Sequence, residues 1–301
     1  KQLDVNGEWE NLARRSGEIS SELEVFKNGN PDNYVSWLDR RGRGVFLEAC
    51  PIDVSPLLRD NLFEKVPTCV LTSATLTVGG STAYMQSRLG LEDVEGNTLS
   101  TEFDFQKQAA LYIPANLPDY RSTDYLGQAS DEIENIIKIS RGRAFVLFTS
   151  YQQMQACYKM LASKLPYPTL LQGKTSRSRL LEEFRRKENA VLFATSSFWQ
   201  GIDVKGDALS CVIVDKLPFQ VPSDPLVQAR IRQIETAGGN AFSDYQVPAA
   251  ILRLKQGFGR LIRSRSDRGI LAILDSRLRT QGYGKLFLAS LPDYSIVDRV
   301  E

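Results

Sequence analysis

The sequence predicts an α/β protein built on a parallel sheet that helices cover on both faces. Short apolar runs recur along the chain and alternate with longer segments whose apolar residues repeat with a helical period. Because the runs are almost continuously apolar, they are typical of parallel strands buried on both faces. The predicted strands are residues 45–49, 69–73, 109–113, 144–148, 190–194, 211–214 and 269–274, and the helical patterns between them include 151–165, 176–187, 225–236 and 248–261.

The first segment of the chain predicts an amphipathic helix. Its apolar residues recur at helical spacing with polar residues between them, and they are Trp9, Leu12, Ile19, Leu23 and Phe26. A polar stretch, 92–108, is longer than a typical loop and predicts a boundary between two domains, 1–105 and 106–301. The first domain holds too few strands for a complete α/β domain, so we interpret it as the end of one.

The composition is that of an ordinary soluble globular protein. The 301 residues are 42% hydrophobic and 24% charged, with a formal net charge of +1. A nucleic-acid site must therefore come from local clustering, and basic residues do cluster between Arg253 and Arg268, opposed only by Asp267. A solvated helix face is the alternative interpretation of that run. No apolar run approaches the ~20 residues that span a bilayer, and the polar beginning is unlike a secretory signal, so we expect a cytoplasmic protein.

The cysteine and histidine content excludes several classes of site. The four cysteines, none of which forms a Cys-x-x-Cys pair, are Cys50, Cys69, Cys157 and Cys211. Their wide spacing predicts reduced, mostly buried thiols rather than ligands of zinc or of an iron–sulfur cluster. The chain has no histidine, which excludes histidine-dependent catalysis and histidine metal ligands. We therefore predict no metal-ligand set within the chain.

Two stretches imitate nucleotide-binding motifs. Gly173-Lys174-Thr175 matches the end of a phosphate-binding loop, but Pro168 replaces the glycine required five residues earlier and has no N–H group to offer. Asp131 and Glu132 imitate a magnesium-binding acidic pair, but their helical context predicts surface carboxylates near a helix start. The sequence therefore predicts no complete nucleotide site of its own.

The run 254–263 predicts a polyphosphate-binding helix face. On a continuous helix Gln256, Arg260 and Arg263 fall at i, i+4 and i+7 and project from one side. Each glycine inside a helix costs about 1 kcal/mol relative to alanine. Gly257 and Gly259 therefore predict close approach by a partner strand or a ligand, and simple helix packing is the alternative.

A second pattern, residues 191–203, is an apolar strand that runs into hydroxyl residues, aromatic residues and a Gly-Ile-Asp turn. Ligands gather at the carboxyl ends of parallel strands, where this loop must lie. Thr195 and Ser197 suit contacts to a nucleic-acid backbone, and Asp203 suits a ribose or an arginine. Trp199 is open to two interpretations, base stacking and core packing.

Two further strands end in hydroxyl residues. Residues 70–76 end in a compact turn that contains Ser73 and Thr75, and residues 145–151 end in Thr149, Ser150 and Tyr151. Serine and threonine are common at strand ends, so each pattern is weak alone. Ser150 is also suited to be the N-cap of the following helix.

In chain order, Thr72-Ser-Ala-Thr-Leu76, Leu147-Phe-Thr-Ser-Tyr151, the segment 196–206 and Gln256-Gly-Phe-Gly-Arg-Leu-Ile-Arg263 resemble motifs III to VI of superfamily 2 helicases. The sequences at residues 49–55, 216–219 and 275–277 resemble those of the DinG and YoaA relatives of the XPD helicases. This resemblance implies a second RecA-like helicase lobe, preceded by the tail of the first lobe. The first helix would be the end of an arch insertion.

The resemblance also implies a 5′ to 3′ DNA helicase that moves on single-stranded DNA and uses ATP and Mg²⁺, which it shares with the first lobe. Arg260 and Arg263 would be arginine fingers, with Gln256 beside them. The implied nucleotide contacts are Gln200, Gly201, Asp203 and Gly259; the implied nucleic-acid contacts are Thr149, Ser150, Tyr151, Thr195, Ser197 and Trp199; Ser73 and Thr75 would couple the two sites.

The resemblance places three features before residue 1: the phosphate-binding loop, the Asp-Glu magnesium motif, and the four-cysteine iron–sulfur segment of many relatives. We therefore expect residues 1–301 alone not to hydrolyse ATP. We expect a monomer that works with replication or DNA repair proteins. The alternative function is a catalytically idle α/β module that binds nucleic acid or a protein partner. A small-molecule phosphotransferase is excluded because the chain has neither a phosphate loop nor a catalytic base.

Overall fold

The computed structural model describes residues 5–28, 33–195, 198 and 208–299. The chain folds into two compact units. The smaller consists of Lys1–Val70, Gln86–Glu92 and Gln220–Tyr245, and the larger of Leu71–Met85, Asp93–Phe219 and Gln246–Glu301. Each unit contains residues from both sides of the domain boundary predicted at residue 105, which stays a prediction.

A seven-stranded parallel sheet forms the centre of the larger unit, with strand order β5-β6-β4-β7-β8-β3-β9. The strands are β3 (Ala109–Tyr112), β4 (Ala144–Phe148), β5 (Thr169–Leu171), β6 (Val191–Thr195), β7 (Cys211–Val214), β8 (Gly269–Ile273) and β9 (Ser295–Val297). In the central strand β4, Val146 is paired with Phe193 of β6 on one side and with Ile213 of β7 on the other. The predicted fold class is confirmed.

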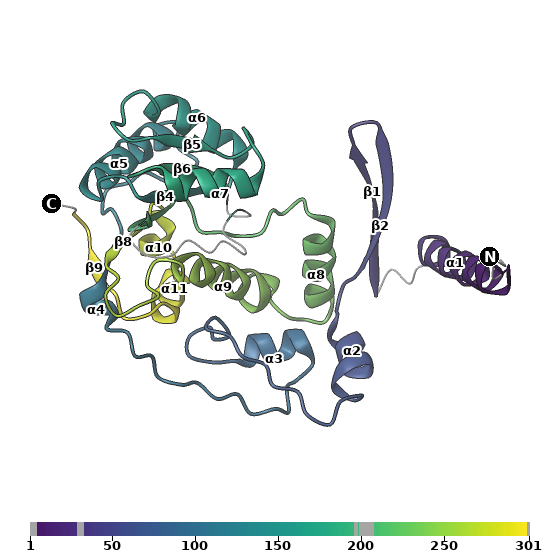
Figure 1. Cartoon of the computed structure of the whole chain (residues 1–301). Helices are drawn as coiled ribbons and strands as arrows, with labels where there is room; N and C mark the ends of the chain where they lie inside the picture. Colours follow the sequence, from purple (N-terminus) through teal and green to yellow (C-terminus); the bar gives the residue numbers. More distant parts are fainter. Residues whose placement is uncertain (1–4, 29–32, 196–197, 199–207, 300–301) are drawn as a thin grey trace. The chain divides into compact units, whose positions relative to one another are not determined.

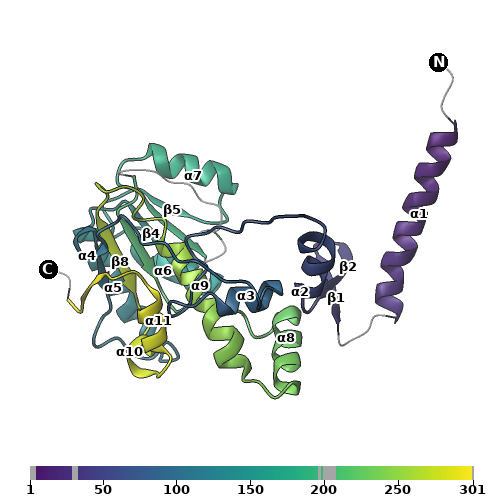
Figure 2. The same cartoon turned by 90° about the horizontal axis from the view of Figure 1, so that it is seen from below.

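Helices cover both faces of this sheet (Figure 1). Because side chains alternate along a strand, Phe145 and Leu147 of β4 join one core while Val146 and Phe148 join the other. The first core is closed by α7 (Arg177–Arg186), α9 (Val247–Phe258), α10 (Arg277–Thr280) and α11 (Gly284–Ser290), and the second by α5 (Tyr125–Ile139) and α6 (Tyr151–Leu161). Figure 2 shows α7 beside β5 at one end of the sheet. The short α4 (Phe105–Gln108) leads into β3.

Side chains cap the starts of several helices. Ser150 begins α6 by accepting a hydrogen bond from the backbone N–H of Gln153 at 3.4 Å, and Ser176 begins α7 in the same way with Arg179. Polar residues that follow a buried strand therefore also start the next helix. This places both helix starts at the sheet edge where the strands end.

The smaller unit contains α1 (Val5–Asn28) and an antiparallel hairpin of β1 (Tyr34–Arg41) and β2 (Gly44–Pro51), visible as a long ribbon in Figure 1. It also includes α2 (Ser55–Leu58), a π-helical segment η1 (Arg59–Phe63) and α8 (Pro225–Thr236), with Arg230 donating to the carbonyl of Ile52 at 2.9 Å. Helix α3 (Ala83–Leu89) and a π-helical segment, η4 (Phe242–Gln246), each contain residues of both units. The amphipathic helix predicted at the start is confirmed, and its apolar residues Trp9, Leu12, Ile19 and Leu23 are each more than half exposed.

The prediction of a strand at 69–73 is wrong. This segment belongs to no strand in the structure, Cys69 is exposed, and Val70 is 82% exposed. A strand requires a neighbour that bonds to its N–H and C=O groups, and apolar composition does not supply one. Among the described residues, no strand lies against this segment. The prediction of buried thiols holds for Cys157 and Cys211.

Candidate functional site

Strand order brings several of the predicted nucleic-acid residues together. We call the side of the sheet where its parallel strands end the carboxyl edge. Thr195 ends β6 and is paired with Phe148, the last residue of the neighbouring β4, so Thr149, Ser150 and Tyr151 emerge beside it. Thr149, Ser150 and Thr195 are partly buried, and Tyr151 is exposed. The carboxyl edge therefore presents a row of hydroxyl groups from two adjacent strands.

Gln172, which the sequence reasoning missed, organises this row. It follows the end of β5, and its Oε1 accepts hydrogen bonds from the Thr195 amide at 2.7 Å and the Thr195 hydroxyl at 3.0 Å. Its carbonyl accepts a hydrogen bond from the Tyr151 hydroxyl at 3.3 Å. A polar residue directly after a short apolar run was the available indication. Gln172 thus links the ends of three strands.

The Gly-Lys-Thr sequence forms a turn after β5 and packs against α6. Gly173 has a φ of +95°, and a Cβ there would lie 2.2 Å from the Tyr151 hydroxyl, so only glycine fits without movement. The Lys174 ammonium donates to the Tyr158 hydroxyl at 3.2 Å and lies 4.7 Å from the centre of that ring. This turn places a cation at the carboxyl edge.

A buried carboxylate supports the end of β4 from the other side. Asp215 follows β7, is 2% exposed, and accepts a hydrogen bond from the Thr149 amide at 2.9 Å. Burial raises the pKa of this carboxyl to about 7, even though the Lys216 ammonium lies 3.8 Å from its other oxygen. The only local indication of this residue is an acidic side chain directly after an apolar run.

The next strand carries a second buried acid. Asp275 accepts hydrogen bonds from the Leu217 amide at 2.8 Å and from the Arg277 guanidinium at 2.6 Å. That guanidinium lies 4.2 Å from the centre of the Tyr120 ring. These bonds join the turns after β7 and β8, and Asp215 in the first of these turns is bonded to Thr149 of the hydroxyl row.

Part of the second pattern lies outside the described residues, namely Ser197, Trp199, Gln200, Gly201 and Asp203. Phe198 is described and buried, and its carbonyl accepts a hydrogen bond from Arg177 of α7 at 3.0 Å. The expected roles of these five residues stay predictions.

The prediction that Gln256, Arg260 and Arg263 share one helix face is wrong. Helix α9 ends at Phe258, and Gly259 caps it by donating to the Lys255 carbonyl at 2.9 Å. Gln256 is exposed near the helix end, whereas both arginines lie beyond it and are partly buried. Glycine favours the end of a helix, and the chain turns there so that Leu261 and Ile262 enter the core. We call residues 259–268 the arginine loop.

Asp267 holds the arginine loop in shape. Its carboxylate accepts hydrogen bonds from the backbone amides of Arg263 and Ser264, each at 2.8 Å. Partial burial alone would raise the pKa of Asp267, but these bonds and one from the Ser264 hydroxyl lower it. The loop leads directly into β8, so it reaches the sheet at the amino edge, where the strands begin. The arginine loop and the hydroxyl row therefore meet the sheet at opposite edges.

The compact turn at Thr72–Leu76, which we call the hydroxyl turn, lies within the larger unit. Ser73 and Thr75 share a hydroxyl–hydroxyl contact of 3.3 Å, and the Thr75 amide donates to the Ser73 hydroxyl at 3.2 Å. Thr75 lines a cavity of about 970 Å³ together with Lys255 and Gly259. The structure thus brings the predicted coupling residue Thr75 to the start of the arginine loop.

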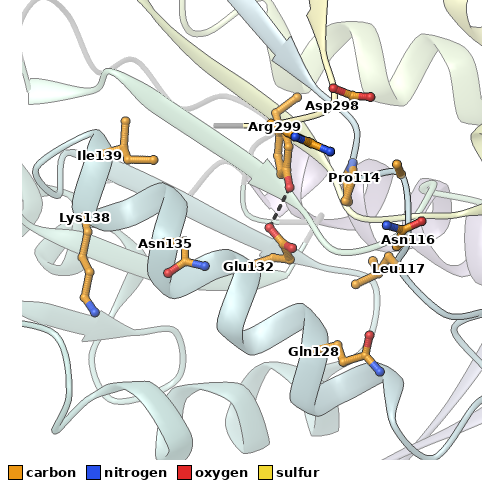
Figure 3. Close-up of a pocket in the computed structure, with 12 residues that line it drawn as sticks. Pro114, Asn116, Leu117, Gln128, Glu132, Asn135, Lys138, Ile139, Asp298 and Arg299 are labelled. Atoms are coloured by element: carbon orange, nitrogen blue, oxygen red, sulfur yellow. Dashed lines mark hydrogen bonds between the residues drawn. The ribbon is translucent and has the colours of Figure 1, made fainter. Parts of the chain in front are cut away.

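A second cavity, of about 720 Å³, lies beyond the end of β3 (Figure 3). Gln128, Glu132 and Asn135 of α5 line one side, and Glu132 accepts a hydrogen bond from the Tyr112 hydroxyl at 2.7 Å. None of the predicted site residues lines it. Asp131 is exposed on the same helix. Neither member of the imitation acidic pair therefore lines the cavity that contains Thr75.

The described ranges contain neither a cluster of metal ligands nor a membrane-spanning helix. Histidine, cysteine and acidic side chains form no group of three or more that could hold a metal ion. None of the described helices combines the length and apolar character needed to cross a membrane.

Comparison with known families places the chain. The family model described as a helicase C-terminal domain matches residues 133–294, which is more than half of the sequence. The chain belongs to this family. The match begins within α5 and extends to the start of β9, so this helicase C-terminal domain includes the hydroxyl row and the arginine loop but not the hydroxyl turn.

Curated relatives extend the match beyond the family model. The ATP-dependent DNA helicase YoaA of Haemophilus influenzae is 40% identical over 286 residues, which are 95% of this chain and 45% of that protein. The YoaA helicase of Escherichia coli is 41% identical over 270 residues, 90% of this chain and 42% of that protein. The chain thus spans less than half the length of these two relatives. The predicted DinG and YoaA-type resemblance is confirmed.

Solved structures support the fold. The structure named XPD_APO has a TM-score of 0.63 and 17% identity, and the match covers 95% of this chain and 59% of that one. At this level of identity the likeness concerns the fold alone. It agrees with a RecA-like parallel α/β lobe.

Proposed function

We propose that this helicase C-terminal domain is part of an ATP-dependent DNA helicase that moves 5′ to 3′ on single-stranded DNA. The observation that carries the proposal is the hydroxyl row at the carboxyl edge, in a chain about 40% identical to proteins named as ATP-dependent DNA helicases. Hydroxyl groups and backbone amides bind phosphates without reading sequence, as a moving motor requires. The N-terminus of α6 adds favourable dipole charge beside Ser150.

The proposed arginine fingers come from the opposite edge. Arg260 and Arg263 would stabilise charge on the phosphates of ATP, with Mg²⁺ and the phosphate-binding loop supplied by another lobe. Asp267 supports this role because it fixes the loop backbone at Arg263. Gln256, Gly259, Gln200, Gly201 and Asp203 are proposed to line the same cleft. We propose no iron–sulfur ligand in this chain.

The proposed setting follows from this activity. We propose a cytoplasmic monomer whose main partner is single-stranded DNA, with replication or repair proteins as further partners. A catalytically idle binding module is the other candidate function. It would need the carboxyl edge but not an ordered arginine loop.

Replacement of Arg260 tests the proposal in the intact protein. We expect Arg260→Ala to lower DNA-stimulated ATP turnover at least about a hundredfold, because an arginine finger stabilises the transition state. The Kd for single-stranded DNA should stay within about twofold, because the loop and the hydroxyl row lie at opposite edges. Steady-state ATPase assays and fluorescence anisotropy with an oligonucleotide measure the two effects.

Arg265→Ala is the matched control. Arg265 lies in the same loop but is exposed and pairs with Glu102 at 2.6 Å, so its loss should leave turnover unchanged. Full turnover in Arg260→Ala would refute the finger assignment. An intact wild-type protein that binds DNA without hydrolysing ATP would favour the idle module.

A further inference from the structure

The segment that follows the hydroxyl turn is fastened to two helices of the larger unit. The Lys255 ammonium of α9 donates to the Thr77 carbonyl at 2.8 Å and to the Thr77 hydroxyl at 3.0 Å. Two residues later, the Gly79 amide donates to the Ser290 hydroxyl of α11 at 2.8 Å. Val78, between these anchors, packs against the core. Residues 77–79 are therefore hydrogen-bonded to both α9 and α11.

Lys255 is an unusual residue for this position on α9. It is partly buried, and among the described residues it forms no ion pair. Burial lowers the pKa of its ammonium group. Removing a charge from water is unfavourable unless other groups solvate it, and Thr77 supplies the two oxygens that do so. The contact between α9 and Thr77 is therefore specific to an ammonium or a similar donor.

Lys255 also contacts the start of the arginine loop through its backbone. Its carbonyl accepts the hydrogen bond from the Gly259 amide at 2.9 Å, which closes the last turn of α9. Arg260 follows this cap directly. A single residue thus contacts Thr77 with its side chain and supports the beginning of the arginine loop with its backbone.

We propose that Lys255 is a positioning residue that ties the hydroxyl turn to the arginine loop, so that the two shift together during ATP turnover. The inference rests on the proposed function and deepens it, because it names the physical connection between the coupling residues and the arginines. Short chains of hydrogen-bonded groups can carry such coupling when both ends belong to elements that move.

Substitutions at Lys255 and Ser290 test whether Lys255 positions the arginine loop or only holds residues 77–79 in place. In the intact protein, Lys255→Met should lower DNA-stimulated kcat by about threefold to thirtyfold while the KM for ATP changes less than about twofold. Lys255→Arg should keep most of the activity, because its guanidinium can donate to the same oxygens. Ser290→Ala removes the other anchor, which belongs to α11 and leaves the Lys255–Thr77 hydrogen bonds in place, so kcat should stay near the wild-type value.

A smaller change at the same contact keeps the proposal testable if Lys255→Met does not fold. Thr77→Val removes the hydroxyl acceptor and keeps the carbonyl, so it should give a smaller loss than Lys255→Met. The combined variant should lose no more than Lys255→Met alone, because both changes break the same contact. Circular dichroism would confirm that each variant is folded.

The outcomes discriminate between the proposals. An active wild type with wild-type kcat in both Lys255→Met and Thr77→Val would refute the positioning role. A Ser290→Ala variant with the same loss as Lys255→Met would also refute it, because the contacts would then only fasten the segment. A wild-type protein without DNA-stimulated ATPase activity would refute the proposed function and this inference with it.

Discussion

Asp215 is a carboxylate whose charge the surrounding residues compensate only in part. One oxygen accepts a hydrogen bond from the Thr149 amide, and the other lies 3.8 Å from the Lys216 ammonium. Desolvation is therefore the largest influence on its proton affinity, and it raises the pKa from 3.8 to about 7. The position of Thr149 in the hydroxyl row depends on a residue that can lose its charge near neutral pH.

This pKa predicts a pH-dependent stability. Because the folded-state pKa exceeds the ordinary value, the unfolded chain releases its proton first as the pH rises from 3.8 toward about 7. The stability that the protonated form contributes is fully present below pH 3.8 and is lost as the pH rises through about 7. Asp215→Asn keeps an acceptor for the Thr149 amide but cannot titrate. We expect this variant to gain stability relative to wild type across that range.

Urea unfolding at several pH values measures the difference. The gap in the free energy of unfolding between Asp215→Asn and wild type should widen with rising pH and level off above about pH 7. Asp131→Asn, at an exposed position on α5, is the control and should follow the wild-type profile. Parallel profiles for Asp215→Asn and wild type would contradict the assignment of this titration to Asp215.

At the scale of elements, Ser150 belongs both to a helix cap and to the proposed DNA contacts. Its side chain accepts the Gln153 amide at the start of α6, and its neighbours form the hydroxyl row. Ser150→Ala should therefore lower the free energy of unfolding by about 1 kcal/mol, the usual cost of losing a cap. Ser150→Asp should restore the cap and suit the positive end of the helix dipole.

The charge of the aspartate variant distinguishes the two roles. If Ser150 contacts phosphates, Ser150→Asp should weaken single-stranded DNA binding several-fold through repulsion, although its thermal stability matches that of wild type. Ser150→Asn is the neutral control, because asparagine is also a good cap. Equal DNA affinity in the wild-type, Asn and Asp proteins would show that Ser150 serves α6 alone.

The elements also show what the sequence could predict. Strands β3, β4, β6, β7 and β8 were predictable because burial on both faces makes them continuously apolar. The three-residue β5 and β9 were missed because they are too short for a pattern, and β1 because its residues alternate in burial. Helix α9 was predicted three residues too long, since Leu261 continues the apolar period although Gly259 ends the helix.

The site was predictable to a similar extent. Thr149 and Thr195 directly follow strands, so chain topology alone places them at one edge. Gln172 and Asp215 act through contacts with residues 23 and 66 positions away, and no local pattern encodes such partners. Lys255 was visible only as one charge in a basic run. Local sequence thus identified the strand-end residues, whereas tertiary contacts identified those that support them.

At the scale of the whole molecule, a net charge of +1 requires that any DNA-binding charge be local. The basic run that dominates the sequence lies mostly at the amino edge. There Arg265 pairs with Glu102, and Arg268 donates to the carbonyls of Arg265 and Asp267. An exposed cation beside the hydroxyl row is instead Lys174, from the imitation phosphate loop. The most basic stretch is therefore not the one expected to contact DNA.

This arrangement predicts that only one of two similar substitutions changes the binding of single-stranded DNA. Lys174→Gln should weaken single-stranded DNA binding and reduce the slope of log Kd against log salt concentration by about 0.7, the value for one lost phosphate contact on a single strand. Arg265→Gln also removes one positive charge and should change neither quantity, because its charge lies at the other edge and is already paired. Fluorescence titrations with one oligonucleotide at four salt concentrations measure both slopes. Equal reductions in the two variants would mean that net charge determines binding, and a reduction in Arg265→Gln alone would place the DNA at the amino edge. The hydroxyl row is the DNA site only if the salt dependence follows Lys174.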